Sequence, residues 1–375
     1  MTLLSAPNIS GSEWKYVKDC LDTAWVSSVG SYVDRFEAMM AEFTGIKYAV
    51  ATCNGTSALH IALMLAGVGT NDYVLVPNLT FVASSNAISY TGARPILVDV
   101  NECTWQMDLD LLENILKEEC EVKNGRCIYK DGHTIKAVMP VHVLGSMGNM
   151  EQLSRIANNY HLIIVEDATE ALGSYYKGKH SGTFGTMGCF SFNGNKIITT
   201  GGGGIIVTND EVLAKKAKHL TTQAKSDPFE YYHDDVGYNY RMVNVLAAIG
   251  VAQMEQLPSF IKRKKEINQY YKEHLSGVGD ITFQQAVEGA DDNCWLFTLR
   301  SKKQKQLLKA LNNQGLQSRA LWVPMNRLPM HNNNIYVTND DYAGNLYSEC
   351  LSIPCSTYIT TKDIDDVIAV IRACF

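Results

Sequence analysis

The sequence predicts an α/β protein in which a large, mostly parallel sheet is followed by a smaller α+β unit. Between residues 48 and about 210, short apolar runs alternate with segments of helical periodicity. The apolar runs are nearly continuous, as in strands that are buried on both faces of a parallel sheet. Beyond residue 276 this alternation ends. At 375 residues the chain is long enough for two or three domains.

Strands and helices of the first part are expected to follow one another in pairs. The pattern predicts strands over 48–51, 73–76, 95–98, 137–141 and 162–165, and helices around 59–66, 84–90, 109–116 and 151–159. The polar insert 123–133 interrupts the alternation, and we expect it to form a surface loop or hairpin. Four consecutive glycines, 201–204, precede a further apolar run over 205–207.

The second part begins with two long helical patterns, 243–256 and 259–275, separated by Pro258. Because proline favours the first turn of a helix, we expect two separate helices and place a domain boundary between them. The prediction is a large domain over 1–257, including the N-terminal segment, and a small domain over 258–375. The small domain should contain a strand near 295–299, helices near 307–311 and 363–373, and a loop-rich stretch over 316–349. Long loops of this kind often carry function.

Composition restricts the class of function. Hydrophobic residues make up 46% of the chain and charged residues 19%, which is typical of a folded globular protein. With 33 basic and 39 acidic residues the net charge is −6, which disfavours nucleic-acid binding. We expect the longest basic run, Lys262–Lys265, to be a solvated helix face.

Location and metal content are predicted from other patterns. The first residues lack the basic and apolar segments of a signal peptide, and no stretch of about 18 apolar residues occurs, so we expect no membrane segment. The ten cysteines show no C-x-x-C pair and no zinc-ligand spacing. We therefore expect no metal site and a reducing compartment, the cytoplasm. Cys350 and Cys355 are interpreted as small core residues.

Candidate binding residues follow the predicted strands, where parallel sheets bind ligands. After the first strand, Gly55, Thr56 and Ser57 open a helix, whose N–H groups and positive end favour an anion such as phosphate. A simple helix cap by Thr56 or Ser57 is the alternative. Asp167 ends the fifth strand, where a carboxylate is costly to bury unless it meets a cation or strong donors. Its alternative role is also a helix cap.

Lys196 is the third candidate. It follows Ser-Phe-Asn-Gly-Asn, precedes the glycine run and has small or apolar neighbours. A desolvated lysine can act as a nucleophile and as a carrier of protons. A phosphate site, a buried carboxylate and an isolated lysine are together the groups that pyridoxal 5'-phosphate requires. The lysine would bind the cofactor covalently, and the carboxylate would keep its pyridine nitrogen protonated.

Five sequence blocks resemble those of a known family. They are 54–59 (Asn-Gly-Thr-Ser-Ala-Leu), 166–174 (Glu-Asp-Ala-Thr-Glu-Ala-Leu-Gly-Ser), 182–185 (Gly-Thr-Phe-Gly), 191–196 (Ser-Phe-Asn-Gly-Asn-Lys) and 237–241 (Gly-Tyr-Asn-Tyr-Arg). In this order they are similar to the signature blocks of the DegT/DnrJ/EryC1 sugar aminotransferases, from about residue 8 to the C-terminus. The resemblance implies the pyridoxal phosphate-dependent transferase fold of type I, which is that of aspartate aminotransferase.

The resemblance also implies roles for individual residues. Lys196 would carry the cofactor and move protons, and Asp167 would pair with the pyridine nitrogen. Glu170 would lie beside the ring hydroxyl. Phe81 would stack on the ring, although from the sequence alone it is more simply a core residue. Gly55 belongs to the phosphate-binding turn, and the phosphate would be held by Thr56, Ser57, Ser191 and, from a neighbouring subunit, Asn239. A site of this kind implies a homodimer with shared active sites.

Finer features are similar to one branch of the family. These are 221–225 (Thr-Thr-Gln-Ala-Lys), 319–322 (Arg-Ala-Leu-Trp) and 328–330 (Leu-Pro-Met), although the branch usually has proline at position 320. That branch transfers an amino group, expected here from glutamate, to C4 of UDP-4-keto-6-deoxy-N-acetylhexosamines in bacillosamine and legionaminic acid synthesis.

Several alternatives stay open. Within the fold, they are an aminotransferase of another nucleotide sugar, of the GDP-perosamine or dTDP 3- or 4-amino type, and a sugar dehydratase. The dehydratase branch that deoxygenates C3 has histidine at the position of Lys196, which argues against it. A nicotinamide-dependent oxidoreductase is disfavoured because no Gly-x-Gly-x-x-Gly follows the first strand. A binding protein that has kept the fold is disfavoured by the intact pair Lys196 and Asp167.

Overall fold

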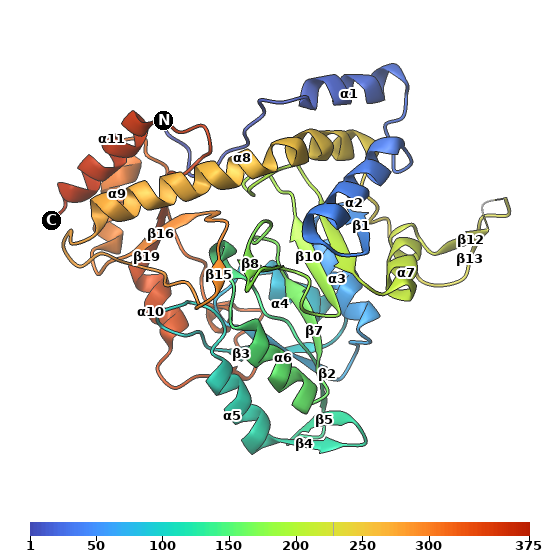
Figure 1. The fold of residues 1–375 in the computed structure, drawn as a ribbon. Helices are drawn as coiled ribbons and strands as arrows, with labels where there is room; N and C mark the ends of the chain where they lie inside the picture. Colours follow the sequence, from blue (N-terminus) through green and yellow to red (C-terminus); the bar gives the residue numbers. More distant parts are fainter. Residues whose placement is uncertain (228) are drawn as a thin grey trace.

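A computed structural model of the chain describes residues 1–227 and 229–375 (Figure 1). Its centre is a large sheet with the strand order β1-β11-β10-β7-β6-β2-β3-β18. Pairing is parallel from β10 to β18, and β11 is antiparallel to both of its neighbours. The strands are β1 (Tyr48–Thr52), β2 (Asp72–Pro77), β3 (Arg94–Val98), β6 (Thr134–Val138), β7 (Ile163–Asp167), β10 (Met187–Ser191), β11 (Gly204–Thr208) and β18 (Tyr336–Val337). The mostly parallel sheet is confirmed.

Helices cover both faces of this sheet (Figure 1). They are α2 (Ser31–Thr44), α3 (Gly55–Leu65), α4 (Ala83–Tyr90), α5 (Leu109–Glu119), α6 (Met150–Asn159), α7 (Glu211–Thr221) and α8 (Asn244–Leu275), whereas α1 (Glu13–Asp22) packs on α8. Val74 and Val76 face the core that contains α3, whereas Tyr73 and Leu75 face the core that contains α5 and α6. Because successive strand residues point to opposite faces, two apolar cores require unbroken apolar strands.

The polar insert forms a hairpin, as expected, from β4 (Cys120–Lys123) and β5 (Arg126–Tyr129). Three short strands form a small second sheet: β8 (Tyr175–Tyr176), β9 (Lys179–His180) and β15 (Ala290–Asp291). A further hairpin of β12 (Lys225–Asp227) and β13 (Tyr232–His233) projects from the body of the molecule (Figure 1).

The C-terminal part contains a four-stranded antiparallel sheet with its own core. The strands are β14 (Thr282–Phe283), β16 (Phe297–Arg300), β17 (Arg319–Ala320) and β19 (Cys350–Ile353). The remaining helices are α9 (Gln304–Asn313), α10 (Tyr342–Glu349) and α11 (Thr361–Arg372), with 3₁₀ turns η1 (Val143–Gly145) and η2 (Met325–Arg327). The chain's N-terminal segment joins this part, since the backbone of Cys355 donates to Leu4 and that of Gln317 donates to Thr2.

Three sequence expectations are wrong in detail. The two helices expected around Pro258 are one 32-residue helix, α8, with the proline inside it. The neighbours Leu257 and Phe260 are buried, so tertiary packing holds the helix across the missing hydrogen bond. The end of the loop-rich stretch is helical, as α10. Lys264 is only 2% exposed, because its ammonium group donates to backbone carbonyls and is thereby compensated.

The division into domains 1–257 and 258–375 stays a prediction. In the described residues, β18 from the second segment pairs with β3 of the large sheet, and α8 runs through the predicted boundary. The described part of the chain contains no helix long and apolar enough to span a membrane. Cys350 and Cys355 are buried, as expected of core residues.

Candidate active site

The site lies where β7 and β10 end beside the start of α3. β7 and β10 are parallel, with Asp167 opposite Cys189, so both strands deliver their last residues to the same edge of the sheet. Asp167 is 2% exposed. Its Oδ2 accepts a hydrogen bond from Ser84 Oγ at 2.7 Å, and its Oδ1 accepts one from the backbone N–H of Thr169 at 3.2 Å. No helix follows over 168–171, so the helix-cap alternative for Asp167 is wrong.

Asp167 has no cationic partner within ion-pair distance among the residues that the structure describes. A buried carboxylate without a counter-charge costs several kcal/mol. Its two hydrogen bonds offset only part of this cost. The protonated pyridine nitrogen of pyridoxal phosphate supplies both a positive charge and an N–H donor, so the residue fits that group.

The start of α3 packs closely against the ends of the neighbouring strands β10 and β11. Asn54 caps the helix by accepting from the N–H of Ser57 at 2.8 Å, so the alternative in which Thr56 or Ser57 is the cap is wrong. A side chain at Gly55 would place its Cβ 2.8 Å from Cβ of Ser191. At Gly204, which starts β11, a Cβ would come within 2.4 Å of the Asn54 backbone. Both glycines are therefore required for this turn to pack against the ends of β10 and β11.

This arrangement suits a phosphate group. The helix start presents its positive end and N–H groups. Thr56 is half-buried and Ser57 is buried at that end, while Ser191 is half-buried at the end of β10 and is brought to the turn by the contact with Gly55. The structure thus places these three predicted hydroxyl groups on adjoining elements.

Lys196 lies in the turn that follows β10, with 13% of its side chain exposed. Its Nζ is 3.5 Å from Oε1 of Glu170 and 4.1 Å from the centre of the Trp295 ring. Lys196 is thus held among a carboxylate and an aromatic face rather than in solvent. These surroundings fit the expected role of Lys196, which is to react with an aldehyde and to carry protons, and that role stays a prediction.

Glu170 is 5% exposed, and burial raises its pKa, although the nearby Lys196 cation and the N–H of Leu144 oppose this effect. Oε2 of Glu170 accepts from that N–H at 2.8 Å. Leu144 has a φ of 62°, in the left-handed region that a leucine rarely adopts. Backbone strain of this kind is stored where the surroundings impose it, and here it aims an N–H at Glu170.

Glu166 has a role that sequence reasoning missed. Its carboxylate is completely buried and bonds to Nε2 of His142 and to the backbone N–H groups of Gly182, Phe184 and Gly185. It therefore holds the 182–185 block against β7. Glu166 and Asp167 point to opposite faces of the strand. Two adjacent carboxylates at the end of an apolar run are a signal that one of them binds backbone.

Ser84 and Trp295 were also missed. Ser84 lies 83 positions before Asp167, and Trp295 lies about 100 positions after Lys196. No local pattern in the sequence marks either residue. By contrast, Phe81 is 53% exposed, so its interpretation as a core residue is wrong and its ring is accessible.

Asn239 is not joined to the phosphate-binding residues within one chain. It is exposed, and its backbone forms a bridge with Thr222. Among the described residues, no hydrogen bond connects its side chain to Thr56, Ser57 or Ser191. The roles of these site residues stay predictions.

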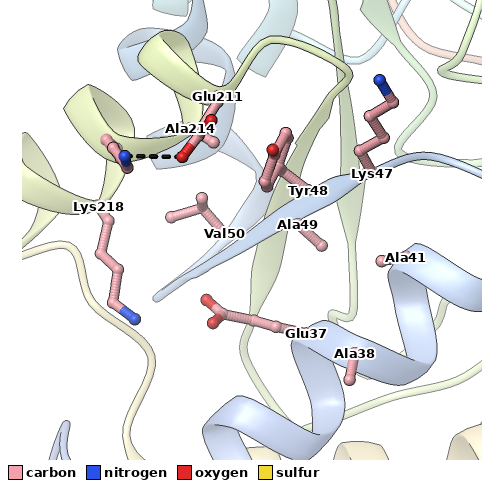
Figure 2. A pocket seen from close by; sticks show the side chains of 11 residues that line it. Glu37, Ala38, Ala41, Lys47, Tyr48, Ala49, Val50, Glu211, Ala214 and Lys218 are labelled. Atoms are coloured by element: carbon pink, nitrogen blue, oxygen red, sulfur yellow. Dashed lines mark ion pairs between the residues drawn. The ribbon is translucent and has the colours of Figure 1, made fainter.

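A separate cavity of about 330 Å³ lies between α2, β1 and α7 (Figure 2). Its lining includes alanines 38, 41 and 49 and the ion pair between Glu211 and Lys215. None of the predicted site residues lines it. The chemistry described above therefore lies outside this cavity.

Comparison with known proteins agrees with the geometry. The family model of the DegT/DnrJ/EryC1/StrS aminotransferases matches residues 7–372. The chain is 40% identical to the GDP-perosamine synthase of Escherichia coli O157:H7 over 328 residues, which cover 87% of this chain and 85% of that protein. It is 37% identical to the GDP-perosamine synthase of Caulobacter vibrioides over 376 residues, which cover 98% and 96%.

Among solved structures, S. venezuelae DesV in complex with a ketimine intermediate is similar with a TM-score of 0.88 and 27% identity, covering 97% of this chain and 94% of that one. The fold is therefore the type I fold of pyridoxal phosphate-dependent transferases, and the cofactor of this enzyme is pyridoxal phosphate. Since the family model spans nearly the whole sequence, the chain belongs to the DegT/DnrJ/EryC1/StrS aminotransferase family.

Proposed function

We propose that this enzyme transfers an amino group from L-glutamate to C4 of a nucleotide-linked 4-keto-6-deoxy sugar. The observation that carries the proposal is the placement of the Lys196 amine 3.5 Å from the buried carboxylate of Glu170, on the edge of the sheet where Asp167 is buried without a cation. When bound, pyridoxal phosphate supplies the electron sink and stores the amino group between the two half-reactions.

The residues divide the work by their chemistry. Asp167 would hold a proton on the pyridine nitrogen, because its negative charge is otherwise uncompensated. Lys196 would bind the cofactor covalently and, when released, move a proton in each half-reaction. Thr56, Ser57 and Ser191 would bind the phosphate beside the start of α3, where Gly55 allows close approach.

The nucleotide is the finer part of the proposal. We place a GDP-linked sugar first, because the two relatives at 40% and 37% identity are GDP-perosamine synthases. The second candidate is UDP-4-keto-6-deoxy-N-acetylglucosamine, in bacillosamine or legionaminic acid synthesis, favoured by the motifs at 221–225, 319–322 and 328–330. The chain just before 328–330 contacts Asn78, directly after β2, through the backbone N–H of Met325 and the side chain of Asn326. We propose that this segment, next to the end of β2, takes part in selecting the sugar nucleotide.

The assembly is also part of the proposal. Asn239 would reach the phosphate bound by a second copy, which gives a homodimer with shared sites and accounts for its exposure in a single chain. The cytoplasm suits the ten free cysteines, since thiols remain reduced there.

The test is a panel of GDP-, UDP- and dTDP-linked 4-keto-6-deoxy sugars incubated with glutamate and the holoenzyme. Product mass reports amination, and NMR reports the configuration at C4. We expect an amine from the GDP-linked sugar and none from the Lys196→Ala variant. A product that has lost water and gained no nitrogen would favour the dehydratase alternative. No reaction with any 4-keto sugar, from protein that holds the cofactor on Lys196, would refute the proposal.

A further inference from the structure

Trp295 is the aromatic partner of Lys196. The indole is 2% exposed, and Lys196 Nζ lies over it at 4.1 Å from the ring centre. Indole Nε1 donates to the backbone carbonyl of Asn195 at 2.6 Å. The same side chain therefore contacts the amine and binds the turn that carries it.

Hydrogen bonds hold the backbone of Trp295 at both its N–H and its carbonyl group. Its N–H donates to Oδ1 of Asn293 at 2.9 Å, and its carbonyl accepts from the buried ammonium of Lys264 at 2.8 Å. Asn293 is fully buried, and its amide also donates to the carbonyls of Glu170 and Leu172 at 2.8 and 2.9 Å. One short segment, 293–295, thus holds the backbone of Glu170 and places an aromatic face against Lys196.

An amine that must leave the cofactor and return needs a resting position. A surface lysine would extend into water, where its ammonium is well solvated and far from the reacting atoms. The aromatic face attracts an ammonium group without a directional hydrogen bond, so the amine can leave it easily. The Glu170 carboxylate, 3.5 Å away, offers a hydrogen-bond acceptor in the same place.

We propose that Trp295 is a positioning residue for the reaction: its indole face holds the Lys196 amine inside the site whenever the amine is not bonded to the cofactor. This inference rests on the proposed function of Lys196. It assigns to Trp295 a role beyond packing, because the packing role alone requires an apolar side chain of similar size and no π system over the amine.

Two substitutions separate these roles. Trp295→Phe keeps an aromatic face and loses the hydrogen bond to Asn195. Trp295→Leu keeps an apolar side chain and loses both. Trp105→Leu is the matched control, since Trp105 is also a buried tryptophan, 1% exposed, and it belongs to the core. Melting curves of the full-length variants show which of them are folded.

The first readout needs no activity. Full-length protein without cofactor is treated with a trace of acetic anhydride, and peptide mapping gives the acetylation of Lys196 relative to Lys215, whose side chain is 75% exposed. A cation–π contact in a partly desolvated site corresponds to roughly a tenfold change in occupancy. We expect Trp295→Leu to raise the relative labelling of Lys196 about tenfold, Trp295→Phe to raise it less than about threefold, and the control to leave it unchanged.

The second readout is a single turnover of the holoenzyme with glutamate, followed by the cofactor's absorbance. The rate constant should fall about tenfold in Trp295→Leu and much less in Trp295→Phe, with the half-saturating glutamate concentration unchanged. Equal labelling of Lys196 in the wild type and both variants would overturn the inference. Equal increases in Trp295→Phe and Trp295→Leu would also overturn it, because they would assign the effect to the lost hydrogen bond.

The experiments can refute the proposed function and the role of Trp295 independently of each other. If the labelling follows the expected order but no 4-keto sugar is aminated, only the proposed function fails. If sugars are aminated but the labelling of Lys196 does not respond to Trp295, only this inference fails.

Discussion

The substitution Glu166→Gln should destabilise the protein by about 2–4 kcal/mol, a magnitude that follows from the four donors around the carboxylate. Oε1 accepts from the N–H groups of Phe184 and Gly185, and Oε2 accepts from Gly182 and His142. A glutamine amide replaces one oxygen by a donor. Turned toward Phe184, it leaves two backbone N–H groups without an acceptor.

Turned toward His142, the amide costs less, because the imidazole can change tautomer and accept from it. The buried N–H of Gly182 then remains unpaired, which costs about 1–3 kcal/mol of folding stability. The other three bonds also lose the strengthening that a charged acceptor provides. This second orientation sets the expected magnitude, and it leaves the 182–185 block attached by only part of its original contacts.

Urea unfolding of the cofactor-free protein, at one fixed protein concentration, measures the change. The control is Glu113→Gln, because Glu113 forms an exposed ion pair with Arg155, and its loss should leave the unfolding midpoint close to that of the wild type. Hydrogen exchange should accelerate at Gly182, Phe184 and Gly185 in Glu166→Gln alone. Equal midpoints for the two variants, with unchanged exchange over 182–185, would refute the reasoning.

The remaining predictions concern the site. Borohydride reduction of the holoenzyme and peptide mapping should place the pyridoxyl label on Lys196, and a label on another lysine would contradict the assignment. Asp167→Asn should slow the single-turnover reaction on the order of 10³-fold, because the shape is kept and the charge is lost; near-normal turnover would move the role to Glu170. Burial raises the pKa of Glu170 above the ordinary glutamate value of 4.5. At pH values above 4.5 the folded state therefore binds more protons than the unfolded state. Wild-type stability should therefore fall relative to Glu170→Gln as the pH rises from 4.5, and parallel stability–pH profiles would contradict this. Lys196→Ala and Asn239→Ala, refolded as an equal mixture, should recover about a quarter of wild-type activity in a two-fold dimer. Activity no higher than the average of the two separate variants would mean that Asn239 acts within its own chain or not at all.

The strands of the large sheet could be predicted because both of its faces are covered. Each strand must then be apolar at successive positions, as at Tyr73 and Val74, and this pattern is visible in a single sequence. Pro258 was misjudged because the local preference for a helix start is outweighed by burial on both sides of it. The burial of Lys264 was missed because its carbonyl partners, Trp295 and Cys355, lie 31 and 91 positions away.

In the site, too, residues with a local sequence pattern could be predicted, and residues that meet only through the fold could not. Lys196 and Asp167 stand out locally, one in a glycine-rich turn and the other at the end of an apolar run. Their partners do not, because Ser84 and Trp295 meet them only through the fold. The strained backbone of Leu144 has no local signature either, since its conformation is imposed by the surroundings of Glu170.

The pairing of the N-terminal segment with the C-terminal sheet has a consequence for the order of folding. Leu4 and Cys355 are 351 positions apart, so closing this contact in a flexible chain costs about 5 kcal/mol of entropy. During synthesis the segment can dock only after Cys355 has left the ribosome, while the parallel strands up to β7 can already pair. Ser5 donates to the carbonyl of Asn195, beside Lys196. The turn that carries Lys196 is therefore supported by the segment around Ser5 only after the segment around Cys355 has been made.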